Sequence, residues 1–247
     1  MALAGKRIVV TRPAELAQGL AALIAGAGGE PLLYPAIEIR AAEDPGPALA
    51  LLAHIEAYDL AVFVSPSAVQ RALALLRERP WPPRLRVAAM GSGTRRELET
   101  RGFREVIAPP GQADSEALLA LPELAQVAGL RVLILRGAGG RELLGETLAA
   151  RGARVDTAEC YRRVRPAADA ATEPAGRLDG ICVNSAAALE NLLALLGRER
   201  LAHTPLFVSH ARVGQLARES GLGEAVVAGP GDGEMLACLL AYFSGTK

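Results

Sequence analysis

The chain of 247 residues is long enough for two ordinary domains, each with a hydrophobic core of its own. A hydrophobic fraction of 51% and a formal net charge of zero at pH 7 argue against a general nucleic-acid-binding protein, which normally carries a basic excess. Because no apolar run reaches membrane-spanning length and no secretory pattern opens the chain, we expect a cytoplasmic protein that binds neither membrane nor nucleic acid.

The first predicted elements are a strand at 7–11, a helix that begins at Pro13, and a second strand at 30–34. The following segment 35–41, PAIEIRA, alternates polar and apolar residues and is typical of an exposed extended segment. A loop with prolines and a glycine then precedes a helix that ends near residue 57. This order of strand, helix and strand favours a parallel sheet.

The stretch 58–76, YDLAVFVSPSAVQRALALL, is the clearest strand-to-helix transition. An apolar run that ends at Val64 is typical of a strand buried on both faces. Ser65 is a favourable N-cap, and Pro66 stands where the first helical residue needs no N–H donor. Backbone N–H groups and hydroxyls at such a turn can bind an anion. The alternative is that Ser65 and Ser67 only cap the helix.

A second transition follows at the strand predicted for 86–90 and the turn from Gly91 to Thr94. Thr94 with Glu97 matches a capping box for the next helix. The elements predicted after it are a short strand at 105–108, a helix at 115–125, a strand at 130–135 and a helix at 141–151.

The last third of the chain begins with an extended segment, 153–164. The segment 165–177 is rich in alanine, proline and charge and is interpreted as a loop. From residue 178 a second run of strands and helices continues to Tyr242, and Ser185 occupies the position that Ser65 holds in the earlier transition.

These elements repeat at a nearly constant offset, which indicates two similar domains instead of a solenoid. The equivalent segments are 7–40 and 131–164, 58–76 and 181–196, and 86–111 and 205–231.

The repeat predicts an α/β protein with two similar flavodoxin-like domains and about five parallel strands in each. The order of elements also allows two contiguous domains. If both extended connectors cross between domains, the N-terminal domain is discontinuous and the connectors pair as a two-stranded linker. The corresponding boundaries are 1–35 with 165–247 for the first domain, 42–157 for the second, and 36–41 and 158–164 for the linkers.

Ligands of parallel α/β sheets bind beyond the carboxyl ends of the strands. Arg12 and Arg136 hold equivalent positions at such ends, so each can contact an anionic ligand, or can instead pair with a local carboxylate. The candidate ligand-binding residues at the strand ends are Arg12, Ser65, Ser67, Ser92, Thr94, Arg136, Gly137, Ser185 and Ser209.

These strand ends contain no paired carboxylates, no Cys/His dyad and no metal-binding cluster, so they favour recognition of an anion over hydrolase or metalloenzyme chemistry. No metal and no cofactor is therefore expected. The GxG patterns of the chain each lack the third glycine of a dinucleotide fingerprint. His210 is interpreted as a solvated loop residue, with ligand contact as the alternative. Tyr161 places a phenol on the second connector, facing the expected cleft, and its alternative role is packing.

Several segments in order resemble uroporphyrinogen-III synthase over nearly the whole chain. They are TRP at 11–13, VFVSPSAV at 62–69, the glycine–threonine turn that ends at Thr94, ECYRR at 159–163 and VNSAAALENL at 183–192. The resemblance implies two α/β domains joined by a two-stranded linker, with a discontinuous N-terminal domain. It also implies a lyase of haem biosynthesis that closes linear hydroxymethylbilane to uroporphyrinogen III, inverts the last pyrrole ring and loses water, without cofactor or metal.

The resemblance further implies that Tyr161 helps the substrate hydroxyl to leave, that Thr94 lines the cleft, and that Ser65 and Ser185 form the serine turns of the two domains. Arg212 is a candidate carboxylate contact at a position where some members carry a threonine. The implied partners are hydroxymethylbilane and, transiently, hydroxymethylbilane synthase, and a monomer is expected. The alternative is a two-lobed small-anion-binding or sensory module without catalysis.

Overall fold

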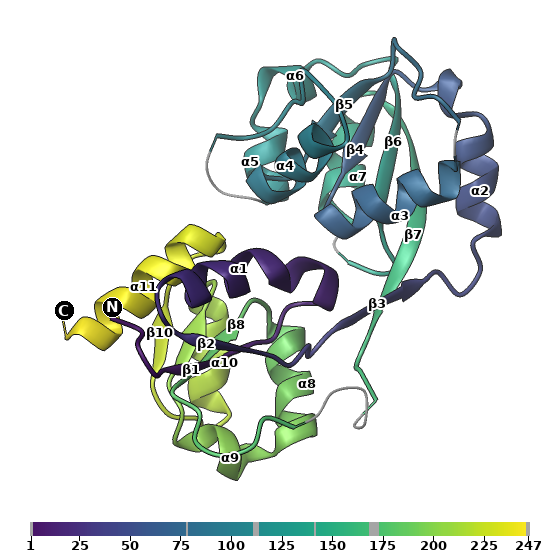
Figure 1. The fold of residues 1–247 in the computed structure, drawn as a ribbon. Coiled ribbons are helices and arrows are strands. Elements are labelled where there is room, and N and C mark those ends of the chain that lie inside the picture. Colours follow the sequence, from purple (N-terminus) through teal and green to yellow (C-terminus); the bar gives the residue numbers. More distant parts are fainter. Residues whose placement is uncertain (1, 78, 111–113, 141, 168–172, 246–247) are drawn as a thin grey trace. The chain divides into compact units, whose positions relative to one another are not determined.

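The computed structural model describes residues 2–245 with the exception of 78, 111–113, 141 and 168–172. The chain divides into two compact units, which are visible in Figure 1. The first unit comprises Met1–Glu38 and Val164–Lys247, and the second comprises Ile39–Arg163. The first unit is therefore discontinuous in sequence. The domain boundaries drawn from the sequence stay predictions.

The first unit contains a five-stranded sheet with the order β10-β9-β8-β1-β2, in which all neighbours are parallel. This is the order of a flavodoxin-like sheet when the strands are counted along the chain. The strands are β1 (Arg7–Val10), β2 (Glu30–Leu33), β8 (Gly180–Val183), β9 (Leu206–Val208) and β10 (Ala225–Val227).

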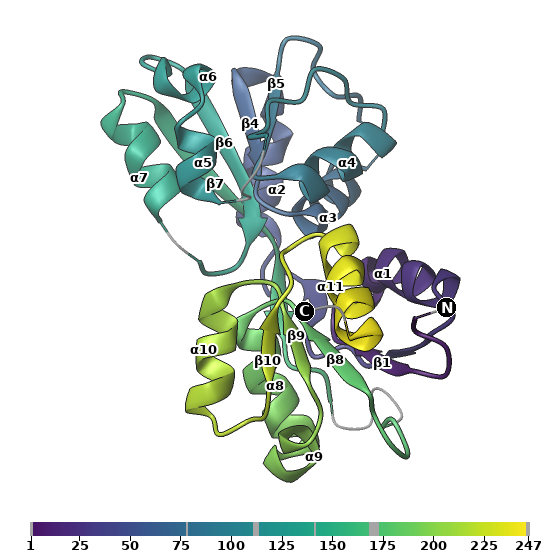
Figure 2. The same ribbon diagram turned by 90° about the vertical axis from the view of Figure 1, so that its left-hand side faces the viewer.

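Helices cover both faces of this sheet, with α1 and α11 on one face and α8 and α10 on the other (Figures 1 and 2). The face under α1 and α11 holds a core that includes Ile8, Val10, Leu20, Phe207 and Leu239. The helices are α1 (Ala14–Gly26), α8 (Ala186–Leu196), α9 (Arg198–Ala202), α10 (Ala211–Glu219) and α11 (Asp232–Ser244).

The second unit also contains a five-stranded sheet, with the order β3-β7-β6-β4-β5. The central strand β4 is buried along its whole length and pairs in parallel with β5 and β6. The short strand predicted at 105–108 is reduced to a single bridge between Ala88 and Ile107. The strands are β3 (Glu38–Ala41), β4 (Leu60–Phe63), β5 (Arg86–Ala89), β6 (Arg131–Gly137) and β7 (Arg154–Val164).

The core on one face of this second sheet consists of aliphatic side chains of β4 and β6 and of the leucines of the short helices packed on them. Leu118, Leu124, Leu144 and Leu148 belong to this core. The helical elements are α2 (Gly46–Ala53), η1 (Ile55–Ala57), α3 (Pro66–Leu76), α4 (Ser92–Thr100), α5 (Ser115–Leu119), α6 (Pro122–Ala125) and α7 (Leu143–Ala150). No helix in the described ranges is both long and apolar enough to cross a bilayer.

The predicted fold class is confirmed, because the two units use the repeated segments in the same way. The order β7-β6-β4-β5 in the second sheet corresponds to β2-β1-β8-β9 in the first. Val10 at the end of β1 pairs with Cys182, whereas Val64 follows β4 in the other sheet. The additional strand β3 lies beside β7 at the edge of the second sheet.

The expectation of an exposed segment at 35–41 is wrong. Ile37 and Ile39 are each only 8% exposed. The alternation of polar and apolar residues was correctly identified, but β3 joins a sheet edge and turns its apolar side chains away from solvent, as a half-buried strand does.

The two serine caps are predicted to contribute measurably to stability. Ser185 precedes α8, and its Oγ accepts a hydrogen bond of 3.1 Å from the backbone N–H of Ala188. We expect Ser185→Ala to lower the free energy of unfolding by about 1 kcal/mol in urea titrations, because one N–H loses its acceptor. Ser92→Ala is the control, since Ser92 is exposed and caps no helix. Equal losses in both variants would contradict a capping role.

Candidate functional site

Three neighbouring strands of the second unit place polar turns at one edge of the sheet. The strands β6, β4 and β5 lie in this order and end next to Gly137, Ser65 and Gly91. Helices α3 and α4 begin at the last two of these turns. A Cβ atom at Gly93 would lie 3.9 Å from Cγ of Pro66, so the two helix starts are close together. Their free N–H groups favour an anionic ligand.

Ser65 and Tyr161 form a hydroxyl pair at this edge. The two oxygens are 2.9 Å apart, and Ser65 Oγ also accepts a hydrogen bond of 3.0 Å from the Ala68 N–H. Arg163 donates a 3.1 Å hydrogen bond to Tyr161 Oη, and its Cζ lies 5.5 Å from the centre of the ring. The side chain of Tyr161 is buried, at 1% exposure, whereas Ser65 is half-buried.

The hydrogen bonds of this pair leave one hydroxyl proton unassigned. Ser65 and Tyr161 carry one O–H proton each, and only one proton lies between their two oxygens. Ala68 and Arg163 act as donors to the pair, so they take up none of its protons. The other proton is available to an acceptor outside the pair. Because Ser65 is the more exposed member, its O–H is the accessible donor when Tyr161 donates to it.

A β-bulge and a glycine hold the ring of Tyr161 in this position. The pairing of β6 with β7 shifts between Arg136, which faces Glu159, and Gly137, which faces Tyr161. Cys160 is the extra residue, and it is buried together with its neighbour Tyr161. Bulges often redirect a side chain next to a functional site. A Cβ atom at Gly137 would lie 2.6 Å from Cε2 and Cζ of Tyr161, so the ring requires a glycine there.

Arg136 lies at the same strand end but binds local carboxylates. Its Nη2 donates to Glu142 at 2.7 Å and is 3.4 Å from Glu159 Oε1. Glu159 also accepts a 3.1 Å hydrogen bond from the backbone N–H of Gly139. These contacts correspond to the local pairing stated as the alternative for this arginine.

The remaining predicted residues of the second unit differ in accessibility. Ser67 and Thr94 are each 4% exposed, whereas Ser92 is exposed. The predicted capping box of Thr94 and Glu97 is wrong: α4 begins at Ser92, so Thr94 already lies in its first turn. The N-cap is Gly91 instead of Thr94, so the helix begins three residues earlier than the sequence pattern suggested.

The first unit has an equivalent set of turns. Ser185 caps α8 as Ser65 caps α3. Ser209 is 3% exposed, donates to the carbonyl of Asn184 at 2.8 Å, and lies 2.8 Å from Nδ1 of His210. His210 and Arg212 are exposed at the start of α10.

Arg12 of the first unit is also occupied by local partners. It forms a close ion pair with Asp232, the first residue of α11, and donates to the carbonyl of Pro230 at 3.0 Å. The guanidinium therefore links the end of β1 to the start of α11. Like Arg136, Arg12 therefore matches the alternative expectation, in which the arginine pairs with a local carboxylate.

Two residues of these edges were not among the sequence candidates. Arg163 was missed, although strand alternation places it on the same face as Tyr161 two residues earlier. The side-chain oxygen of Asn184 is buried and has no hydrogen-bond partner among the described residues. A buried acceptor without a donor is costly, so a ligand N–H would be a favourable partner for it.

Thiol chemistry at these edges is disfavoured by burial. Burial raises the pKa of both the Cys160 and the Cys182 thiol to about 12, so both stay protonated at neutral pH. Within the described ranges no group of three or more His, Cys, Asp or Glu side chains is placed to hold a metal ion.

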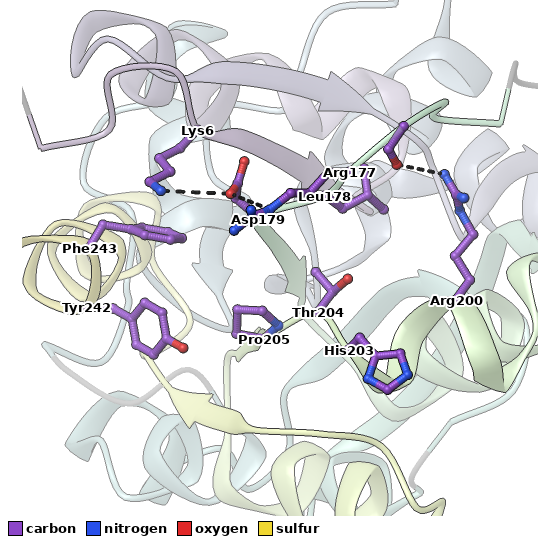
Figure 3. Close-up of a pocket in the computed structure, with 11 residues that line it drawn as sticks. Lys6, Arg177, Leu178, Asp179, Arg200, His203, Thr204, Pro205, Tyr242 and Phe243 are labelled. Carbon is purple, nitrogen blue, oxygen red and sulfur yellow. Dashed lines mark hydrogen bonds and ion pairs between the residues drawn. The ribbon is translucent and has the colours of Figure 1, made fainter.

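A pocket of about 550 Å³ lies at the opposite, amino-terminal edge of the first sheet. Figure 3 shows that two of its cations face one carboxylate: Lys6 and Arg177 lie 3.8 Å and 3.4 Å from Asp179. Arg200 lies 3.1 Å from Glu173. This pocket therefore has little uncompensated positive charge.

Comparison with known proteins identifies clear relatives. A sequence model described as uroporphyrinogen-III synthase HemD matches residues 18–237. The uroporphyrinogen-III synthase of Escherichia coli (strain K12) is 36% identical over 239 residues, which cover 93% of this chain and 97% of the relative. The Salmonella typhimurium (strain LT2) uroporphyrinogen-III synthase is 37% identical with the same coverage.

Two solved structures share the fold. Uroporphyrinogen-III synthetase from Helicobacter pylori 26695 aligns with a TM-score of 0.65 and 16% identity, covering 96% of this chain and 99% of that chain. A mutant uroporphyrinogen III synthase from the extremely thermophilic bacterium Thermus thermophilus aligns with a TM-score of 0.57 and 18% identity, covering 98% and 100% of the two chains.

Proposed function

Because the chain belongs to the uroporphyrinogen-III synthase family, we propose that it converts hydroxymethylbilane to uroporphyrinogen III in tetrapyrrole (haem) biosynthesis. The reaction closes the macrocycle, inverts the last pyrrole ring and releases water, so the enzyme is a carbon–oxygen lyase. The observation that supports this most directly is the hydroxyl pair of Ser65 and Tyr161 with its available proton.

The substrate suits the turns of both units. Hydroxymethylbilane carries acetate and propionate carboxylates on its pyrrole rings, and helix N-termini with adjacent hydroxyls bind such anions. The proposed contacts in the second unit are the helix starts at Ser65 to Ser67 and at Ser92 to Thr94, and the backbone at Gly137. In the first unit they are Ser185, Ser209 and Arg212, while Asn184 can accept a hydrogen bond from a pyrrole N–H.

The chemical step needs one proton donor. The bond between carbon and the terminal hydroxyl breaks as the oxygen takes a proton and leaves as water, while the adjacent pyrrole nitrogen supplies the electron pair. The last ring then attacks the resulting cation through its substituted carbon, and after rearrangement a ring proton is lost. General acid catalysis of the first event contributes typically about 10²–10⁴-fold.

The proposed donor is the hydroxyl pair itself. Tyr161 is the sequence-predicted catalytic residue, and Ser65 is its half-buried and more accessible partner. In one arrangement Tyr161 donates its proton to Ser65, and Ser65 donates its own proton to the substrate. In the other, Ser65 donates to the phenol oxygen, and the phenol O–H donates directly to the substrate. Arg163 donates to the phenol oxygen and so orients the O–H away from itself. The glycine at position 137 and the bulge at Cys160 position the ring.

Arg12 and Arg136 are proposed as secondary contacts of substrate carboxylates. Hydrogen bonds to charged groups contribute about 1.5–3 kcal/mol, but the local carboxylates already use part of the charge of both arginines. We therefore expect Arg12→Ala and Arg136→Ala to raise KM by about fivefold, and more than they lower kcat, with larger effects at low salt. Steady-state kinetics at two ionic strengths would measure this.

The matched control for both arginines is Arg154→Ala. Arg154 is exposed at the start of β7, away from the strand ends that carry the site. An unchanged KM in both Arg12→Ala and Arg136→Ala would show that these arginines only stabilise their units.

The function itself is tested by product analysis. Purified protein is incubated with hydroxymethylbilane that is generated enzymatically in the same vessel, and the isomers of uroporphyrinogen are separated after oxidation. We expect the type III isomer in excess. Type I isomer alone, formed at the uncatalysed rate, would contradict the proposal and would favour a binding or sensory module.

The proposal also covers the oligomeric state, the localisation and a protein partner of the enzyme. We expect a cytoplasmic monomer of 25.7 kDa that receives its labile substrate through transient contact with hydroxymethylbilane synthase. Light scattering after gel filtration tests the monomer, and a change of its elution on addition of hydroxymethylbilane synthase tests the contact.

A further inference from the structure

A groove of about 850 Å³ lies in the second unit at the edge opposite the candidate site. It is bordered by the ends of α3 and α4 and by the loop that leads into β5. The candidate site lies at the starts of the same two helices and at the carboxyl ends of the strands. The groove is therefore separate from the residues proposed to bind and convert the substrate.

The lining of the groove is strongly basic although the chain as a whole has zero net charge. Among the described residues that line it, two are glutamates, Glu105 and Glu123. The arginines that line it are Arg77, Arg79, Arg84, Arg86, Arg101 and Arg104.

Four of these six arginines form no ion pair with another residue in the part of the chain that the structure describes. Arg79 and Arg101 lie 3.9 Å and 3.2 Å from glutamate oxygens. In contrast, Arg84, Arg86 and Arg104 are exposed and form no ion pair with another described residue. Helix C-termini attract cations through the helix dipole, but these three arginines lie in loops or at the start of a strand. Their charge is available to a ligand.

Aromatic side chains form a fixed wall of the groove. Trp81, the one tryptophan of the chain, lies 5.8 Å from the ring of Phe63 and 5.0 Å from that of Phe103. Its Nε1–H donates to the carbonyl of Leu85 at 3.1 Å. An aromatic wall beside arginines suits a ligand with an apolar body and anionic groups at its periphery.

Backbone strain is concentrated in the same place. Arg77 and Glu105 both have φ of 54°, and no other non-glycine residue in the described ranges has positive φ. Both line the groove. Residues in this conformation carry a cost and cluster at ligand sites, where the surrounding structure maintains them.

We infer that this groove is a second binding site for a tetrapyrrole polycarboxylate, so that the product or a related porphyrin binds away from the candidate active site. The inference rests on the proposed function for the identity of the ligand. The volume lies within the range of small-molecule pockets, about 300–1,000 Å³. The pocket of Figure 3, by comparison, holds cations that already face carboxylates and lacks this uncompensated charge.

The experiment measures binding of uroporphyrin, the stable oxidised porphyrin with the same carboxylates as the product. Calorimetric titration of the wild-type chain should resolve binding at the groove. In Arg84→Glu/Arg104→Glu the affinity of the groove for uroporphyrin should be at least about tenfold weaker, because repulsion replaces charge-assisted hydrogen bonds. The indole N–H resonance of Trp81, unique in the chain, should shift at saturation of that site only. Tyr161→Phe should retain the groove site.

The control Arg154→Glu/Arg198→Glu makes the same change of net charge at exposed positions outside the groove and should bind uroporphyrin as the wild type does. An unshifted Trp81 resonance, equal weakening by the control, or binding of an oligoglutamate peptide in place of uroporphyrin would overturn the inference. Turnover of hydroxymethylbilane by wild type and the groove variant is measured in parallel. If neither protein turned over hydroxymethylbilane, the proposed function would be contradicted. The groove site is tested separately, by the binding of uroporphyrin.

Discussion

Replacing Tyr161 by Phe should lower turnover of hydroxymethylbilane by at least about tenfold, the lower part of what general acid catalysis contributes. The substitution keeps the buried ring against Gly137 and removes only the O–H. The free energy of unfolding should therefore change little. Turnover is measured with enzymatically generated substrate, and stability by urea titration of the same preparation.

The partnership of the two hydroxyls is tested by a double-mutant cycle. Ser65→Ala and Tyr161→Phe should each lower kcat, and the double variant should lose much less than the product of the two effects, because both remove the same proton path. Ser65→Ala additionally loses the cap of α3, at a cost of about 1 kcal/mol in stability.

The matched control is Tyr58→Phe. Tyr58 also carries a hydrogen-bonded phenol, 2.8 Å from Asp156, but it precedes β4 at the opposite edge of the sheet. Its variant should keep full turnover. Full turnover in Tyr161→Phe as well would leave Tyr161 as a packing residue and would direct the search for the donor to Thr94 or to bound water.

Gly137→Ala should lower turnover at least as much as removal of the phenol O–H in Tyr161→Phe does. The new Cβ would lie 2.6 Å from two ring atoms of Tyr161, a distance that real Cβ contacts do not show. The ring must move, which separates Tyr161 Oη from Ser65. We expect a loss of about 1–3 kcal/mol in the free energy of unfolding, as for an overpacked core, together with a loss of turnover.

Gly145→Ala is the control for Gly137→Ala. In α7 of the same unit the new Cβ would lie 3.7 Å from Ile134, an ordinary contact, so stability should be unchanged or slightly higher. The combination Gly137→Ala/Tyr161→Ala should recover part of the stability lost in Gly137→Ala, because the clashing ring is gone. Failure to recover would mean that Gly137 is required for another reason.

Local chemistry was readable from the sequence wherever it depended on neighbouring residues. The caps Ser65 and Ser185 each accept the N–H three residues later, as the pattern of an apolar run, a serine and a leucine-rich helix predicted. Tyr161 and Gly137 were both among the candidates. Their contact was not predictable, because it depends on a register shift between two strands.

The arginines show a different limit. Arg12 and Arg136 end equivalent strands, and the sequence placed both at the expected edge. Their carboxylate partners Asp232 and Glu142 lie 220 and 6 residues away in the chain respectively (232 − 12 and 142 − 136), so sequence separation gave no guide to the pairing. Charge compensation depends on distance in space, which only the folded chain defines.

The repeat alone established that the two units contain the same series of strands, helices and turns. Only the folded structure determined which of the repeated segments combine into one unit. In the first unit Asp179 accepts the backbone N–H of Arg7, and in the second the equivalent Asp59 accepts that of Arg131. The same contact would form if Asp59 were paired with Arg7 in a contiguous domain, so this pattern cannot distinguish the two arrangements.

The distinction lies in side-chain packing between the combined segments. Gly180 opens β8, and a Cβ there would lie 2.8 Å from Phe207 and 3.2 Å from Ile8. The equivalent residue of β4 is Leu60, whose side chain would fill this space. Strand periodicity is the same in both copies, whereas close packing is specific to the residues that meet. For that reason the exchange of segments between the units is a property of the tertiary structure.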